Sequence, residues 1–313
     1  MDKILILAGP TASGKTDTAF AIAQKIPSEI ISFDSMQVYQ GMPIVTQAPP
    51  TFFSTPFGKT PVHLAAFLDP AEEYSAALFR TQASLLVRQI LARGRTPLLV
   101  GGTGLYIRAL VDGLFEMGED NPSNDLEFRR RLQAEEELYG EGHLHERLKS
   151  VDPVSAVKIH SRDIRRIVRA LEVFELTGIP LSQQKPNRKG IRGEYDIRFF
   201  LLERDRAELY ERINLRVDKM REEGVVEEVQ QILSRPLSRT AKGALGVQEI
   251  EAYLKKQTTL SDALELLKKN TRNYAKRQLS WFRHEKGITP VALTPNDNAS
   301  TAADKILHLW NNT

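Results

Sequence analysis

A glycine-rich loop near the N-terminus constrains the fold of this chain more than any other feature. The loop, GPTASGKT at residues 9–16, matches the pattern G-x-x-x-x-G-K-[ST] in full. It follows a short apolar run, KILILA, and precedes a segment whose apolar residues recur at helical spacing. The pattern predicts a buried parallel strand, a phosphate-binding loop and a helix, in that order. A chance glycine turn before a helix is the competing interpretation.

The loop carries the groups that hold a chain of phosphates. Gly9 and Gly14 allow backbone angles that other residues resist, so loop N–H groups can converge on phosphate oxygens at a helix N-terminus. Lys15 adds a positive charge, and the Thr16 hydroxyl can ligate Mg²⁺. We therefore expect Mg²⁺ as a cofactor, with Thr16 as its ligand. The expected phosphate-binding residues of the loop are Gly9, Thr11, Ala12, Ser13, Gly14, Lys15 and Thr16.

Composition limits the classes of protein to which the chain can belong. Its 313 residues suffice for one large domain or two modest ones, and 41% hydrophobic with 27% charged residues is ordinary for a soluble globular protein. A net charge of +3 does not by itself indicate nucleic-acid binding. The absence of cysteine excludes disulfides, zinc fingers and a cysteine nucleophile. No apolar run approaches about 20 residues, so we expect a cytoplasmic protein without signal peptide or membrane span.

Strand, turn and helix recur in order along the chain. Further strands are expected in SEIISFDS, in PLLV before Gly101, in YDIRFFLLERD and in ITPVAL. This order predicts an α/β fold: a P-loop NTPase-like core with a parallel sheet flanked by helices. Such sheets bind ligands at the carboxyl ends of their strands, so Gly9, Asp34 and Gly101 should share one edge. The Pro-rich stretch 41–61 is expected to be an exposed loop.

A second domain is indicated by a change in composition near residue 115. From 116 to 195 the sequence shows charged helical patterns and the basic stretch QQKPNRKGIRGEY, but no convincing strand. We predict a helical insertion domain, residues 116–195, within a core formed by residues 1–115 and 196–313. Core helices are expected at residues 73–93, 206–222, 223–234, 246–256 and 260–285.

Two polar residues at strand ends are candidates for chemistry. Asp34 can hold Mg²⁺ through water, cap a helix, or act as a general base, and its position alone does not decide between these roles. Thr103 stands where many ATP-hydrolysing P-loop proteins have a metal-binding acid. With the glycines around it, Thr103 offers donors suited to a leaving diphosphate. The alternative is a helix-entry turn with Thr103 as N-cap.

Basic residues gather in three places. Arg212 and Arg216, one helical turn apart, can reach a diphosphate or pair with nearby glutamates. Two larger clusters have the composition expected of an RNA-binding surface, although each is also compatible with a solvated helix whose aromatic residues are buried. One cluster comprises Arg162, Arg165, Arg166 and Arg169, which are predicted to share a helix face. The other comprises Lys268, Lys269, Arg272, Lys276, Arg277, Arg283 and Lys286, interleaved with Tyr274, Trp281 and Phe282.

Together these motifs resemble those of the tRNA dimethylallyltransferases, also called isopentenyl-tRNA transferases. The resemblance runs over almost the whole chain and in family order. It rests on GPTASGKT, SFDSMQVYQGM, HLAAFLDPAEEYSAALF, LVGGTGLYIRAL, RRIVRALEVFELTGIPLS, ERINLRVDKM, ALGVQE and TRNYAKRQLSWFR.

The resemblance implies a reaction and its residues. The family transfers a dimethylallyl group from dimethylallyl diphosphate to the exocyclic amine of the adenosine immediately 3′ of the tRNA anticodon. Asp34 would be the general base, while Lys15, the Thr103 hydroxyl and Mg²⁺ on Thr16 would stabilise the leaving diphosphate, with Arg216 among its ligands. The helical insertion would grip the anticodon stem-loop. The tRNA-binding positions implied are Asp34, Ser35, Met36, Gln37, Thr103, Arg129, Arg165, Arg166, Arg169, Gln248 and Arg277.

One segment departs from the family pattern. After YQGM the family reads close to D-I-G-T-A-K-P, whereas this chain reads PIVTQAPP at residues 43–50, with Val45 for the glycine and Ala48 for the lysine. Substrate contacts in this segment are therefore not carried over, and the segment is expected to act as a cover. Val247 also replaces an aromatic residue that is common in the family.

Two other functions remain alternatives. A P-loop small-molecule or nucleoside kinase would use Asp34 to bind an acceptor hydroxyl, but it lacks an acid after PLLV. A non-catalytic RNA-binding module would not need the intact loop residues or Asp34.

Overall fold

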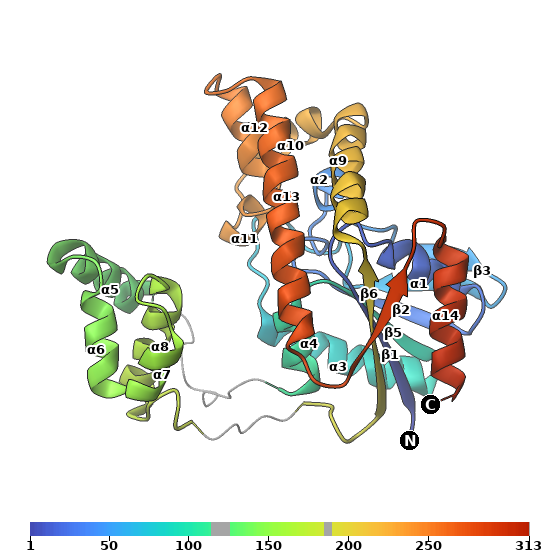
Figure 1. Cartoon of the computed structure of the whole chain (residues 1–313), viewed down its shortest axis with the longest axis horizontal. Coiled ribbons are helices and arrows are strands. Elements are labelled where there is room, and N and C mark those ends of the chain that lie inside the picture. The colour runs from blue at the N-terminus through green and yellow to red at the C-terminus, as the bar shows by residue number, and fades with distance from the viewer. Residues whose placement is uncertain (114–125, 185–189, 313) are drawn as a thin grey trace. The chain divides into compact units, whose positions relative to one another are not determined.

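The computed structural model describes residues 1–113, 126–184 and 190–312 (Figure 1). The chain divides into two compact units, Met1–Gly113 with Gly190–Thr313, and Leu114–Lys189. The predicted boundaries of the insertion were residues 116 and 195. Part of its basic stretch, residues 185–189, lies outside the described residues.

The larger unit is built on a seven-stranded sheet (Figure 1). The strand order is β3-β4-β2-β5-β1-β6-β7, and every neighbouring pair is parallel except β3–β4. This confirms the predicted α/β core with a mainly parallel sheet. The strands are β1 Lys3–Ala8, β2 Ser28–Phe33, β3 Phe52–Thr55, β4 Gly58–His63, β5 Thr96–Gly101, β6 Asp196–Arg204 and β7 Ile288–Leu293.

Helices cover both faces of the sheet, which is why β1 is apolar throughout. Ile4 and Ile6 belong to one buried cluster, with α3 and α4, and Leu5 and Leu7 belong to the other, with α1 and α14. Each such buried side chain contributes about 1.5–3 kcal/mol. The helices of this unit are α1 Lys15–Ala23, α2 Pro43–Thr46, α3 Ala76–Ala92, α4 Gly104–Val111, α9 Arg206–Glu222, α10 Val225–Leu233, α11 Arg239–Lys242, α12 Val247–Leu254, α13 Leu260–Arg283 and α14 Ala299–Asn312.

The prediction that residues 41–61 form an exposed loop is wrong. This stretch contains α2 and the β3–β4 hairpin, and β4 extends the sheet by pairing with β2 at Ile30↔Val62. Gly58, with φ +94°, turns the hairpin. The prolines obscured an alternation in which Thr60 and Val62 are buried against the sheet.

The smaller unit is helical where it is described. Its helices are α5 Leu126–Tyr139, α6 His143–Val151, α7 Pro153–Lys158 and α8 Ile164–Thr177. They enclose their own apolar core, which includes Leu132, Leu144, Leu148, Ile167 and Leu171. The predicted four-arginine helix face is partly wrong, because Arg162 precedes the N-cap Asp163 of α8 and pairs with Glu141.

Among the helices of residues 1–113, 126–184 and 190–312, none combines the length and the apolar character that a bilayer crossing requires.

Candidate active site at the carboxyl edge of the sheet

The three central strands bring the predicted site residues to one edge. β1, β2 and β5 end in register, with Ala8 opposite Gly101 and Gly101 opposite Phe33. A Cβ at Gly101 would lie 2.5 Å from the Phe33 carbonyl oxygen, so the close approach of β5 to β2 requires glycine there. The loops that begin at Gly9, Asp34 and Gly102 therefore start side by side, as the sequence predicted.

The phosphate loop contains polar groups without anionic partners. The Lys15 ammonium is buried and donates to the Pro10 carbonyl at 3.1 Å, and no carboxylate of the described residues forms an ion pair with it. Burial lowers the pKa of Lys15 to about 8, against the raising effect of Asp34, and Arg216 lowers it further. The Ser13 hydroxyl is fully buried and has no hydrogen-bond partner among the described residues. A bound phosphate would supply the missing charge and acceptors.

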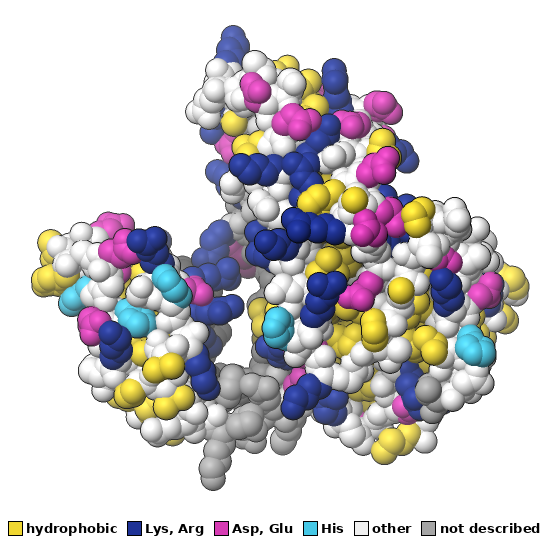
Figure 2. All heavy atoms as spheres, in the orientation of Figure 1, with side chains coloured by type: hydrophobic (Ala, Val, Ile, Leu, Met, Phe, Trp, Pro, Cys, Tyr) yellow, Lys and Arg dark blue, Asp and Glu magenta, His cyan; other side chains and the backbone are white. Residues whose placement is uncertain are grey.

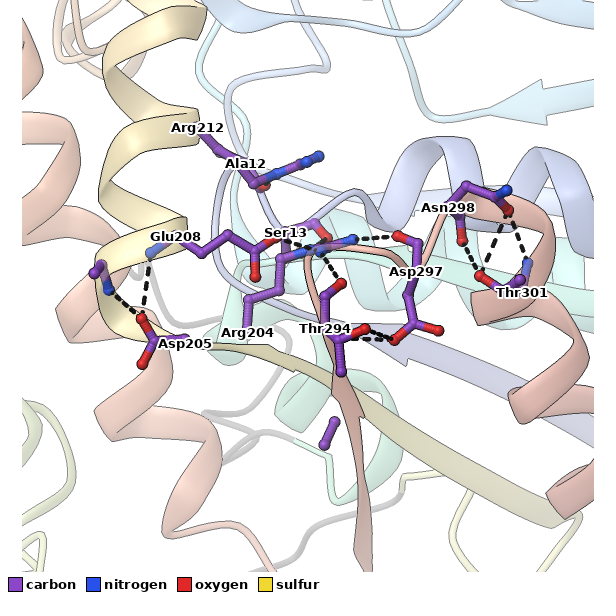
Figure 3. A network of polar contacts seen from close by, with 12 residues as sticks. Ala12, Ser13, Arg204, Asp205, Glu208, Arg212, Thr294, Asp297, Asn298 and Thr301 are labelled. Atoms are coloured by element: carbon purple, nitrogen blue, oxygen red, sulfur yellow. Dashed lines mark hydrogen bonds and ion pairs between the residues drawn. The ribbon is translucent and has the colours of Figure 1, made fainter.

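Two arginines hold the outer side of this loop (Figure 3). Arg204, at the end of β6, donates from Nε to the Ser13 carbonyl at 3.0 Å, and Arg212 of α9 donates from Nε to the Ala12 carbonyl at 2.9 Å. Arg204 also pairs with Glu208, so that carboxylate is not the partner of Arg212 or Arg216. Sequence analysis missed Arg204, because nothing in the pattern of β6 distinguishes it from an ordinary surface arginine.

Arg216 of α9 reaches the same loop from a different direction. Its Nη1 donates to the Thr11 hydroxyl at 2.9 Å and its Nε to Gln47 Oε1 at 3.1 Å. Within the described ranges no carboxylate forms an ion pair with this half-buried guanidinium. Burial lowers the pKa of Arg216, while the charges of Asp34 and Asp17 oppose this effect. The arginine is thus a cation beside the phosphate loop, where the sequence placed a diphosphate ligand.

The acceptor side of the edge is formed by Asp34 and Thr103. Asp34 Oδ1 accepts from the Met36 N–H at 3.0 Å, which forms a tight turn after β2 rather than a helix cap. The Thr103 hydroxyl accepts from the Ser35 N–H at 3.0 Å and donates to the Ser35 hydroxyl at 3.3 Å. Thr103 does occupy the N-cap position of α4, but its side chain makes no cap hydrogen bond. Its hydroxyl instead fixes the loop that carries Asp34.

Two residues of α13 complete this edge, and sequence analysis assigned a role to neither. Gln278 is buried and bridges the two glycine turns, accepting from the Thr11 N–H at 2.9 Å and donating to the Gly102 carbonyl at 3.0 Å. Tyr274 lies near Thr103, and its pKa is raised by burial and by the charge of Asp34. The only signal for Gln278 was its place in the motif TRNYAKRQLSWFR.

The remaining predicted residues are distributed over both units. In the larger unit, Gln37 donates to the Gln47 carbonyl at 2.9 Å, Gln248 is exposed on α12, and Arg277 is exposed on α13, 5.7 Å from the Tyr274 ring. In the smaller unit, Arg129 and Arg169 both pair with the fully buried Glu172, at 2.8 and 2.6 Å. Arg165 and Arg166 are exposed on α8. Their roles in binding tRNA stay predictions.

The residues at the loop are compatible with Mg²⁺ only if a ligand supplies most of its oxygens. The half-buried Thr16 hydroxyl follows Lys15 at the start of α1. Within the described ranges, no group of three or more His, Cys, Asp or Glu residues could hold a metal ion. Mg²⁺ is commonly bound through few protein ligands together with phosphate oxygens and water.

Comparison with known proteins identifies the family. The IPP transferase family model matches residues 37–285, and an isopentenyl transferase model matches residues 2–51. The chain belongs to the IPP transferase family. It is 45% identical to the tRNA dimethylallyltransferase of Symbiobacterium thermophilum over 98% of this chain and 94% of that protein. It is 44% identical to the tRNA dimethylallyltransferase of Carboxydothermus hydrogenoformans, over 92% of this chain and 91% of that protein.

Solved structures of IPP transferases share the fold. The tRNA isopentenylpyrophosphate transferase of Bacillus halodurans is 36% identical with a TM-score of 0.69, and the match covers 99% of this chain and 96% of that one. A eukaryotic dimethylallyltransferase acting on tRNA is 29% identical with a TM-score of 0.80, and the match covers 100% of this chain and 79% of that one. The P-loop NTPase-like fold and the resemblance seen in the sequence are thereby confirmed.

Proposed function

We propose that this IPP transferase moves a dimethylallyl group from dimethylallyl diphosphate to the exocyclic amine of the adenosine immediately 3′ of the tRNA anticodon. The observation that carries the proposal is the position of Asp34. Its carboxylate lies close enough to affect the pKa of both Lys15 and Arg216, and no cation of the described residues pairs with it. A base and a cationic phosphate cradle therefore share one edge of the sheet.

The reaction requires a base because the adenine amine is a weak nucleophile. Its nitrogen lone pair is delocalised into the ring. The new C–N bond forms as the allylic C–O bond breaks, and the electron pair of that bond leaves with the diphosphate. Asp34 takes the proton that the amine nitrogen loses. The Asp34 carboxylate is oriented for this by its bond from the Met36 N–H, and the adjacent loop is held by Thr103.

The leaving group develops negative charge that the loop can stabilise. Lys15, Arg216 and the backbone N–H groups after Gly9 supply positive charge and hydrogen-bond donors that are already in place before the reaction. Mg²⁺ on Thr16 would neutralise further charge on the diphosphate. Gln278 and Arg204 hold the loop backbone in position.

The RNA would lie partly on α13. Lys and Arg side chains cover this helix on the visible face (Figure 2). Phe282 is buried and Trp281 packs on Gly104, so these two rings serve the core rather than stacking with bases. The exposed basic residues near the end of α13 are Lys269, Lys276, Arg277 and Lys286, none with a carboxylate partner in the described part of the chain. They can contact the RNA backbone.

A transfer assay tests the proposal. Purified protein, Mg²⁺, labelled dimethylallyl diphosphate and tRNA with adenosine 3′ of the anticodon should yield labelled tRNA without ATP. The matched control is the same tRNA with guanosine at that position, which should remain unlabelled. ATP consumption with a small-molecule acceptor, and no labelled tRNA, would refute the proposal in favour of the kinase.

A further inference from the structure

The segment that departs from the family pattern is a helix docked on the core. The buried carboxylate of Glu228, on α10, accepts from the N–H groups of Ile44 at 2.9 Å and Val45 at 2.7 Å. It thereby caps the start of α2, where backbone N–H groups otherwise lack partners. Val45 packs closely on Gly246, since a Cβ on that glycine would lie 2.7 Å from Val45 Cγ2. These contacts fix the residue that follows α2.

That residue, Gln47, has a backbone conformation that favours glycine. It ends α2 with φ 54° and ψ 40°, in the left-handed region. A side chain kept at a strained position is a reason to ask what the side chain does. Gln47 Nε2 donates to the Ile44 carbonyl at 2.8 Å, and Gln47 Oε1 accepts from Arg216 Nε at 3.1 Å. The amide is therefore held by its own helix and holds Arg216 in turn.

The hydrogen bond to Gln47 determines how Arg216 meets the phosphate loop. A guanidinium is planar, so fixing Nε against Gln47 and Nη1 against the Thr11 hydroxyl sets the plane of all its N–H donors. We propose that Gln47 is a positioning residue of the diphosphate site: it orients Arg216 so that the guanidinium donors left over bind the leaving group. This inference rests on the proposed function.

The side chain and the backbone of Gln47 serve different contacts. The backbone carbonyl accepts from Gln37 Nε2 at 2.9 Å, on the acceptor side of the site. A substitution that removes only the side chain should therefore affect the diphosphate and leave RNA binding unchanged. The family pattern D-I-G-T-A-K-P has alanine at the position of Gln47, so the interaction belongs to this chain.

The decisive variant is Gln47→Gly, because glycine relieves the backbone strain and removes only the side chain. The binding of dimethylallyl thiolodiphosphate, an unreactive analogue, should weaken about tenfold, the expected scale for loss of one hydrogen bond to a charged group. The melting temperature should stay equal or rise, and tRNA affinity should stay within twofold (about 0.4 kcal/mol) of wild type. Gln40→Ala removes another glutamine of the same segment, bonded to the Phe67 carbonyl, and should change none of these quantities.

A double-mutant cycle separates positioning from a general structural effect. In the background Arg216→Ala, the change Gln47→Gly should cause no further loss of analogue affinity. Equal losses in both backgrounds, or wild-type affinity in Gln47→Gly, would overturn the inference while leaving the proposed function intact. Failure of the wild-type protein to bind the analogue would overturn the proposed function and this inference with it.

Discussion

The buried ammonium of Lys15 makes diphosphate binding depend on pH near neutrality. In the free protein its pKa is about 8 instead of the ordinary 10.5, because it is buried without an anionic partner. A bound diphosphate favours the protonated form and raises the pKa again. The ligand therefore binds the protonated protein more tightly, and affinity must fall as pH rises through about 8.

The size of the effect follows from these two pKa values. If the ligand restores the ordinary value, affinity for dimethylallyl thiolodiphosphate drops about tenfold between pH 7 and pH 9, which is about 1.4 kcal/mol. The phosphate groups add little to this slope, because their last ionisation lies near pH 6, at about the value for phosphoserine. Calorimetry in buffers of different ionisation enthalpy should show uptake of about half a proton at pH 8.

Two variants serve as controls for the pH experiment. Lys219→Ala removes an exposed lysine of α9 and should keep the full pH slope. Lys15→Ala should bind weakly at every pH and lose the slope. An affinity for the wild type that changes less than twofold (about 0.4 kcal/mol) from pH 7 to 9, with no proton uptake, would refute the argument from burial.

Three further predictions concern other parts of the chain. Asp34→Asn should lower kcat in the transfer assay by about 10²–10⁴-fold with tRNA affinity largely kept, whereas equal loss of both would indicate a structural role. Arg165→Ala combined with Arg166→Ala should weaken tRNA binding and flatten its salt dependence by about 0.7–0.9 per lost phosphate contact, and an unchanged slope would remove both from the interface. Glu172→Gln, which deprives two arginines of their buried partner, should lower the free energy of unfolding by about 2 kcal/mol, discounted for the partial exposure of those arginines and measured by urea denaturation.

The sequence predicted the parts of the site that depend on local patterns. KILILA and GPTASGKT place β1 and the phosphate loop, because an apolar run and a glycine turn act over a few residues. Asp34 and Thr103 could be placed because parallel strands end at one edge. The helix α9 was predicted with its observed bounds, Arg206–Glu222.

The parts that the sequence did not predict depend on contacts between distant segments. Gln278 bonds Thr11 across 267 positions, and no local pattern encodes such a pairing. The hairpin β3–β4 was taken for a loop because its prolines and polar residues conceal an edge strand that exists by pairing with β2. Arg129 was assigned to RNA by resemblance, and its ion pair with the buried Glu172 could not be seen before folding.

The bridge formed by Gln278 has a consequence for how the two substrates influence each other. One amide joins the basic helix α13 to both glycine turns, so α13 cannot shift without changing the spacing of the turns that receive the diphosphate. Occupancy of the helix by RNA and occupancy of the turns by the allylic donor are thereby energetically linked. Whatever factor one substrate adds to the affinity of the other must be returned in equal measure, whichever arrives first.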